Sequence, residues 1–271
     1  MKKTIIALLA LAGVAAAESL DATLYTSAQK TDLVGAYNFS STSQTLGSGL
    51  FSNTLTVDNE SDTLKLSYTD SSKVEAYNNS NNITGGDFSV SFDVLDLTLN
   101  SGSDSIILAL SSNASNTGTT TALSLGVNMD GKVYFRNGDG DTSTDVLGFG
   151  RSTKFTETLT LNSSDLVGKT VTIVSNSTDK NLALYIDGTS VYSNSDWEAG
   201  NSGSISLKGM QIGKYLGVGS SAIPSLEIDN FAIWRKALSA NEVQALIVPE
   251  PTTAALSLLA LAGLVMRRRR K

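Results

Sequence analysis

The chain has 271 residues, with 26 Asp and Glu against 20 Lys and Arg, and it contains no His and no Cys. The lack of Cys excludes a disulfide framework, a thiolate nucleophile and a Cys-ligated zinc or iron–sulfur site. The lack of His excludes a Ser-His-Asp triad and an imidazole metal site, so any metal held by side chains would be bound through oxygen, as calcium and magnesium are.

The first 17 residues have the organisation of a secretory signal peptide. Two lysines follow Met1, an apolar run extends from Ile5 to Val14, and three alanines end the segment. Basic, apolar and small-residue regions in this order are typical of an export signal that is removed from the mature protein. We predict cleavage after Ala17, with Ala15 and Ala17 as the small residues of the cleavage site.

Residues 18–248 predict one all-β domain. Apolar and polar residues alternate with a period of two in segments such as Phe88–Val94 and Leu182–Asp187, which is typical of half-buried strands. Asp130-Gly131 and Asp187-Gly188 stand between pairs of such segments, and Asx-Gly supplies the positive φ that two-residue hairpin turns require. Short antiparallel strands joined in this way predict a sandwich of two packed sheets.

One short helix is predicted at the C-terminal end of this domain. Ser239 and Glu242 have the spacing of a capping box, in which each side chain accepts from the backbone of the other residue. Val243, Leu246 and Ile247 then form one apolar stripe. The helix closes the domain just before Val248.

The last segment, residues 249–271, has the organisation of a sorting tail. Pro249, Glu250 and Pro251 precede an uncharged apolar stretch from Thr252 to Met266, and five consecutive cations end the chain. We predict that the apolar stretch is a membrane helix, although it is shorter than the ~20 residues that comfortably span a bilayer. The cations suit a cytoplasmic end under the positive-inside rule, whereas a buried core helix would not normally end in five charges.

Without its two ends the chain is clearly acidic. The body keeps 13 basic and 25 acidic side chains, a net charge of −12. A nucleic-acid partner is therefore not expected, because contact with phosphates requires a basic surface. We interpret the charge as a means of keeping an exported, polar surface soluble.

The three parts of the tail resemble the PEP-CTERM sorting signal of Gram-negative bacteria: Pro249-Glu250-Pro251, a short Ala/Leu-rich helix and an Arg-rich end. The resemblance covers about the last two dozen residues. It implies recognition and cleavage near the tripeptide by an exosortase-type membrane protease. The protein would then be exported across the inner membrane, anchored transiently, and delivered to the cell surface or the extracellular matrix.

Five segments of the body resemble LamG-like jelly rolls of the concanavalin A type: Leu33–Phe39, Gly86–Phe92, Leu184–Gly188, Gln211–Gly213 and Ile228–Ser239 with Glu242. The resemblance spans roughly Leu33 to Ile247, with poor matching between Ser40 and Gly85. It implies a two-sheet antiparallel jelly-roll sandwich that binds a glycan, an extracellular polymer or a protein partner without catalysis. A purely structural matrix protein is an alternative.

A carbohydrate-active enzyme is the other alternative. Laminarinase-like glycosidases of the same fold use a Glu-x-Asp-x-x-Glu strand, and Glu227-Ile228-Asp229 matches its first part. Retaining glycosidases need two carboxyl groups about 5–5.5 Å apart. The third acid is missing, because Ala232 stands at its position, so we predict no catalytic residue.

The resemblance also implies a structural calcium ion. In many jelly rolls of this type a carboxylate on the last strand helps to bind Ca²⁺, which here would be Asp229, with Asp87 from the start of the main sheet. Calcium takes six to eight oxygen ligands, and only these two side chains can be named. The alternative is that Asp229 forms a hydrogen bond with a neighbouring loop.

Sugar-binding sites use aromatic rings as platforms, and the sequence offers three candidates. Trp197 lies in a polar segment and is the strongest, while Tyr192 and Tyr215 are weaker. The alternative for Trp197 is that its ring covers the edge of the sandwich, as large aromatic side chains often do.

Overall fold

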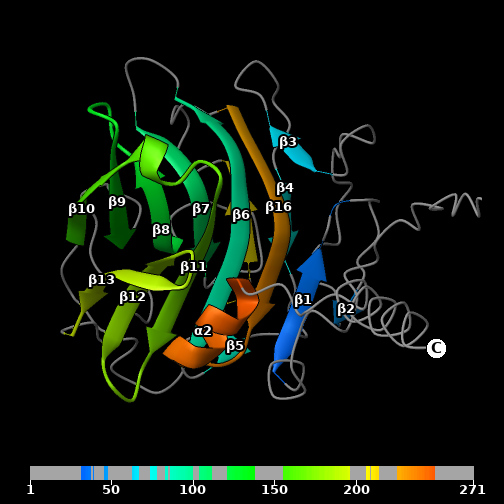
Figure 1. The fold of residues 1–271 in the computed structure, drawn as a ribbon. Coiled ribbons are helices and arrows are strands. Elements are labelled where there is room, and N and C mark those ends of the chain that lie inside the picture. Colours follow the sequence, from blue (N-terminus) through cyan, green and yellow to red (C-terminus); the bar gives the residue numbers. More distant parts are fainter. Residues whose placement is uncertain are drawn as a thin grey trace, which may run out of the picture.

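Two antiparallel sheets lie face to face in the computed structural model, with one short helix on the outside of the larger sheet (Figure 1). The structure describes residues 32–37, 39, 46–47, 63–66, 74–77, 83–84, 86–99, 104–111, 121–137, 155–195, 206–207, 209–213 and 225–247. The predicted signal peptide with Ala15 and Ala17, the aromatic candidates Trp197 and Tyr215, and the tail with Pro249, Glu250 and Pro251 lie outside these residues.

The larger sheet has eight strands and the smaller one six, and every described strand pair is antiparallel. The larger sheet has the order β13 (Thr189–Asn194), β12 (Asn181–Ile186), β11 (Lys169–Asn176), β6 (Phe88–Thr98), β16 (Ser225–Trp234), β1 (Leu33–Tyr37) and β2 (Leu46–Gly47), and β3 (Leu64–Leu66) also pairs with β16. The six-stranded sheet has the order β10 (Phe155–Asn162), β9 (Lys132–Asn137), β8 (Thr121–Val127), β7 (Ser105–Ser111), β15 (Gly209–Ile212) and β4 (Val74–Tyr77). Two short strands, β5 (Ile83–Thr84) and β14 (Ser206–Leu207), form a separate pair, and a 3-10 turn, η2 (Ser163–Asp165), connects β10 to β11.

Both Asx-Gly hairpins are confirmed. Gly131 has φ of 77° in the turn between β8 and β9, and these strands pair directly. Asp187 and Gly188 have φ of 46° and 73° between β12 and β13. In the described part of the chain, the predicted mostly-β class, its antiparallel pairing and the short helix that ends at Ile247 are thus confirmed.

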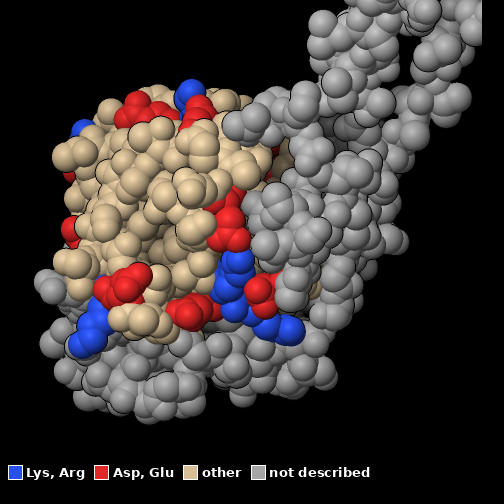
Figure 2. Space-filling view, turned by 60° about the horizontal axis from the view of Figure 1, so that its bottom comes forward, with Lys and Arg blue, Asp and Glu red and all other residues tan. Residues whose placement is uncertain are grey.

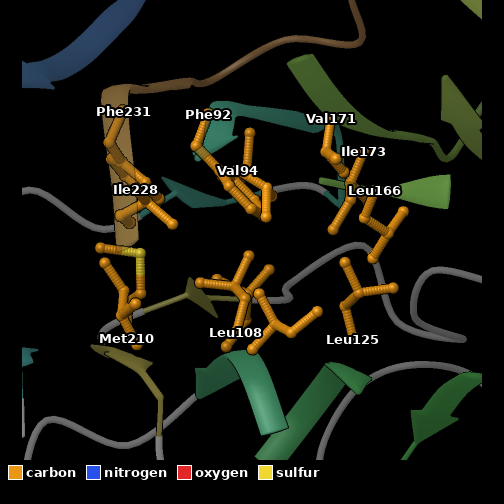
Figure 3. Packing of buried hydrophobic residues seen from close by; sticks show 14 of the residues in the cluster. Phe92, Val94, Leu108, Leu125, Leu166, Val171, Ile173, Met210, Ile228 and Phe231 are labelled. Carbon is orange, nitrogen blue, oxygen red and sulfur yellow. The ribbon is translucent and has the colours of Figure 1, made fainter. Parts of the chain in front are cut away.

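Strand alternation fills the space between the sheets. Phe88, Val90, Phe92 and Val94 on β6 are all buried on the inner face of the larger sheet. Figure 3 shows Phe92 and Val94 facing Leu108 and Leu125 of the opposite sheet, within a continuous apolar layer. Burial of each such side chain contributes about 1.5–3 kcal/mol.

The helix α2 (Ala240–Ile247) covers the outer face of the larger sheet near the start of β6 (Figure 1). Its Val243 is buried in a second apolar cluster with Trp234, Val174 and Ala232, all on the outer face of the sheet. Ser89 joins this region to the sheet, because its hydroxyl donates to the Lys236 carbonyl at 2.8 Å and accepts from the Leu238 N–H at 2.9 Å.

The predicted capping box of α2 is also confirmed. Glu242 accepts from the Ser239 N–H at 2.9 Å, and the Glu242 N–H donates to the Ser239 hydroxyl at 3.3 Å. Lys236 adds an ion pair with Glu242 at 2.6 Å. The short helix is thus fixed at its first turn by side chains as well as by Val243.

We expect acid to loosen α2 through Glu242. Burial would raise the pKa of this carboxyl, but hydrogen bonds from Lys236 and from Ser239, with the charge of Lys236, hold it below the ordinary value of 4.5. A lowered folded pKa stabilises the protein above the unfolded pKa, and this stabilisation is lost as the pH falls through the folded value. Fluorescence of Trp234, measured in a Trp197→Phe background, should report this loss of stabilisation as the pH falls. Glu242→Gln should weaken the acid dependence relative to the parent, and identical profiles would contradict the assignment.

A smaller apolar cluster lies on the outer face of the six-stranded sheet. It contains Ile106, Ala109 and Tyr134, all buried. The Tyr134 ring lies over Gly126, its cross-strand partner on β8: an added Cβ at Gly126 would be 2.7 Å from the Tyr134 ring and 2.7 Å from the Ser105 carbonyl oxygen. Glycine is therefore required here for space.

Within the described residues, no helix is both long and apolar enough to span a bilayer. The predicted membrane helix at 252–266 lies outside these residues and stays a prediction.

Candidate functional site

A strip of polar side chains crosses the outer face of the larger sheet beside α2. The outward positions of β6 change from Ser89 and Ser91, near α2, to Asp93 and then Asp96. Glu227 and Asp229 lie on β16 opposite Asp96 and Asp93. We call the following six residues the polar strip: Asp93, Asp96, Thr170, Glu227, Asp229 and Asn230.

Asp93 is at the centre of the strip and is held on both sides. The Thr170 hydroxyl of β11 donates to its Oδ1 at 2.5 Å, and the Asn230 amide of β16 donates to its Oδ2 at 2.8 Å. Three neighbouring strands therefore fix one carboxylate, which makes this part of the surface rigid.

A bulge in β16 sets the position of Asn230. The pairing of β16 with β6 shifts between Asp229 and Ala232, and Asn230 has φ of 49°. Asn tolerates this left-handed conformation better than most residues. Its N–H donates to Asp229 Oδ1 at 2.7 Å while its side-chain amide reaches Asp93. The bulge thus directs the planar amide of Asn230 across the sheet toward Asp93, as bulges near binding sites often do.

Glu227 occupies the far end of the strip. It accepts from the Thr63 hydroxyl at 2.8 Å and lies 3.8 Å from the Lys65 ammonium group. Lys65 is half exposed, so we assign this ion pair little energy.

An ion pair borders the strip on the side of the β12–β13 turn. Lys169 Nζ lies 2.6 Å from Asp187, which also accepts from the Thr170 N–H at 3.0 Å. Burial would raise the pKa of Asp187, but these hydrogen bonds and the charge of Lys169 hold it below its ordinary value of 3.8. Asp187 is consequently charged at neutral pH.

The glycosidase arrangement is incomplete on this strand. Glu227 and Asp229 share one face of β16, as the alternation predicts, but Ala232 at the third position is buried beside Trp234. The strip offers carboxylate, amide and hydroxyl groups at a fixed spacing. Such groups match the donors and acceptors of a polyhydroxyl ligand without supplying the third acid of the Glu-x-Asp-x-x-Glu motif.

The predicted calcium pair is not brought together. Asp229 is opposite Asp93, whereas Asp87 precedes β6, six residues earlier in the chain. This separation corresponds to about 20 Å along a strand. Asp87 instead accepts from the Ser177 N–H at 2.7 Å and fixes the turn after β11. Across the described part of the chain, no group of three or more acidic side chains is placed to hold a metal ion.

Tyr192 lies where the open edges of the two sheets meet. Its hydroxyl donates to Glu157 Oε2 of β10 at 2.5 Å, the Asn194 amide donates to the same oxygen at 3.3 Å, and its ring is 5.5 Å from that of Phe135. A ring turned inward in this way ties β13 to β10. It does not offer the free face that a sugar platform requires.

Charge on the visible surface is mixed. Figure 2 shows basic side chains beside acidic ones on this face of the described part.

Four residues of the strip were not found by sequence reasoning: Asp93, Asp96, Thr170 and Asn230. Asp93 ends an alternating segment on its polar side, which was the available signal. Thr170 and Asn230 are 77 and 137 positions away from Asp93 in the sequence. The strand register that brings them to Asp93 could not be obtained from local patterns.

No protein-family model matches the sequence, and no curated protein matches it. Solved structures do. The binding domain of Paraclostridial Mosquitocidal Protein 1 is 19% identical, with a TM-score of 0.54, over 81% of this chain and 52% of that one. A botulinum neurotoxin type C structure, which concerns interaction with two ganglioside molecules, is 16% identical, with a TM-score of 0.56, over 81% and 51%. The binding domain of botulinum neurotoxin DC in complex with rat synaptotagmin II is 17% identical, with a TM-score of 0.55, over 81% and 52%.

These matches define a class of fold: the mostly antiparallel β structure of this chain is similar to that of toxin binding domains. It spans about half of the length of those structures. At such identities the likeness shows a shared fold, and what those domains bind is a property of those proteins.

Proposed function

We propose that this chain is an exported surface or matrix protein whose sandwich binds a glycan or a protein partner without catalysis. The observation that carries the proposal is the fold, which is shared with binding domains whose structures concern gangliosides and synaptotagmin II. The incomplete acid set on β16 supports the absence of hydrolysis. The polar strip is the surface that we assign to the ligand.

Two finer assignments belong to the same proposal. The sandwich is of the LamG-like, concanavalin A-type jelly-roll kind, which is supported by the two sheets and by the Trp234 strand followed by a capped helix. The tail is a PEP-CTERM signal cut by an exosortase-type protease, which is supported by the order of tripeptide, apolar stretch and cations.

The proposal predicts that Asn230→Gly weakens ligand binding about tenfold, or about 1.4 kcal/mol. Glycine removes the amide that faces Asp93 and accepts the positive φ of this position without strain. The test applies the released body to a glycan array and to bacterial exopolysaccharide and mucin, and then measures Kd for the retained ligand by titration calorimetry.

Thr158→Ala is the matched control, because Thr158 is exposed on the outer face of the other sheet. Its Kd should equal that of the parent. No saturable binding to any of these materials would contradict the proposal and leave a structural matrix role. Equal weakening by both substitutions would place the ligand elsewhere.

A further inference from the structure

An apolar rim lies at the end of the sandwich away from α2. Among the described residues, four large apolar side chains are exposed, and three of them are at this end: Leu95 (42% exposed), Met129 (68%) and Val167 (36%). We call these three residues the apolar rim. They come from β6, from the turn between β8 and β9 and from the segment after η2, whereas α2 lies near the start of β6 (Figure 1).

Backbone hydrogen bonds hold the three segments of the rim together. The Ser163 N–H of η2 donates at 2.8 Å to the carbonyl of Gly131, in the turn that carries Met129. The Gly168 N–H, just after η2, donates at 2.7 Å to the Val94 carbonyl on β6. The rim is therefore one fixed surface and not three separate loop tips.

A bulge in β6 joins the rim to the polar strip. The pairing of β6 with β16 shifts between Val94 and Asp96, so Leu95 is the extra residue between two cross-strand pairs. Such a bulge changes the direction of the side chains beside it. Leu95 and Asp96 are consequently both exposed, and the apolar rim is continuous with the polar strip.

The end of the sandwich that carries the rim is rich in carboxylates without a cation. The exposed acids beside the rim are Asp96, Asp130 and Asp165. Within the described residues none of these three forms an ion pair. The nearby cations are already engaged, because Lys132 donates to an amide oxygen at 2.8 Å and Lys169 is paired with Asp187.

The strip adds two pairs of carboxylates that face each other. Asp93 is opposite Asp229, and Asp96 is opposite Glu227. Like charges directly across a sheet destabilise it. Positive charge brought by a partner would relieve this repulsion, whereas an anionic lipid surface would add to it.

We propose that the partner is a protein segment with both apolar and basic side chains, which docks on the apolar rim and the adjoining end of the polar strip. This inference rests on the proposed function, in which the strip is the binding surface, and it selects a protein over a glycan. Exposed apolar side chains surrounded by polar ones mark interaction surfaces, and Met is enriched in protein interfaces. None of the four exposed apolar residues in the described part is aromatic, as the platform of a sugar site would be.

A library of random peptides displayed on phage, selected against the immobilised full chain, tests this assignment. We expect the retained peptides to be enriched in Lys or Arg together with large apolar residues. For a synthetic copy of a retained peptide, Met129→Ser should raise Kd about fivefold, because apolar contact area is lost. Asp96→Asn should raise Kd less and weaken its salt dependence, since Asn keeps the oxygen that accepts from the Leu97 N–H and removes only the charge.

Val191→Ser is the matched control, because Val191 is the fourth exposed apolar residue and lies away from the rim on β13. Its Kd should equal that of the parent. Retention of no peptide, retention of peptides without excess positive charge, or equal weakening by Val191→Ser and Met129→Ser would overturn the inference. A glycan that binds in an Asn230-dependent manner and is not displaced by the retained peptide would also overturn it, while leaving the proposed function intact.

Discussion

Trp234→Ala should lower the free energy of unfolding by about 3–5 kcal/mol. Trp234 is completely buried on the outer face of the larger sheet, in the cluster that Val174, Leu238 and Val243 complete. Alanine would leave a cavity beneath α2, and the helix has only one fully buried side chain of its own with which to compensate. The effect should therefore include release of α2 from the sheet.

Urea unfolding monitored by circular dichroism measures this change. Val191→Ala is a suitable control, because Val191 is exposed (39%) on the edge strand β13, and surface changes of this kind stay within about 0.5 kcal/mol. A loss of less than about 1 kcal/mol for Trp234→Ala would contradict the packing of α2 described above.

Gly126→Ala should destabilise the protein by about 1–3 kcal/mol, although it adds only one methyl group. The methyl carbon would lie 2.7 Å from the Ser105 carbonyl oxygen and from the Tyr134 ring. The ring can rotate away, but the carbonyl belongs to the backbone of β7, so β7 and β8 must separate. The thermal midpoint and the urea midpoint should both fall.

Gly35→Ala is the matched control for this substitution. The three atoms nearest to a Cβ at Gly35 on β1 would all belong to the side chain of Tyr37, at 3.0–3.4 Å. The loss should be clearly smaller than at Gly126. If both substitutions have the same effect, contact with the backbone of β7 is not the cause.

The sequence predicted the parts of the fold that depend on neighbouring residues. The Asp130-Gly131 and Asp187-Gly188 turns, and the capping box of Ser239 and Glu242, each need only a few residues to determine their conformation, and all three are present. The alternation in β6 likewise predicted which of its side chains enter the core.

The candidate site depended on contacts that no local pattern specifies. Asp93 and Asp229 face each other because β6 and β16 are neighbours, and Asn230 reaches Asp93 because a bulge rotates it. The structure does not pair Asp87 with Asp229 for the same reason: Asp87 precedes β6, whereas Asp229 lies on β16 opposite Asp93, six residues farther along the chain. Tyr192 was proposed as a platform, and the neighbouring sheet edge turns it into a bridge to Glu157.

The position of β1 has a consequence for the time at which the protein can fold. β1, near the start of the domain, pairs with β16, near its end, so that Tyr37 and Phe231 are partners across nearly the whole length of the domain. Contacts of such long sequence separation form slowly. A ribosome-bound or partly translocated chain lacks β16, and its larger sheet stays open between β6 and β1. Such a polypeptide cannot complete its larger sheet until β16 has been made, which would favour the export that we propose.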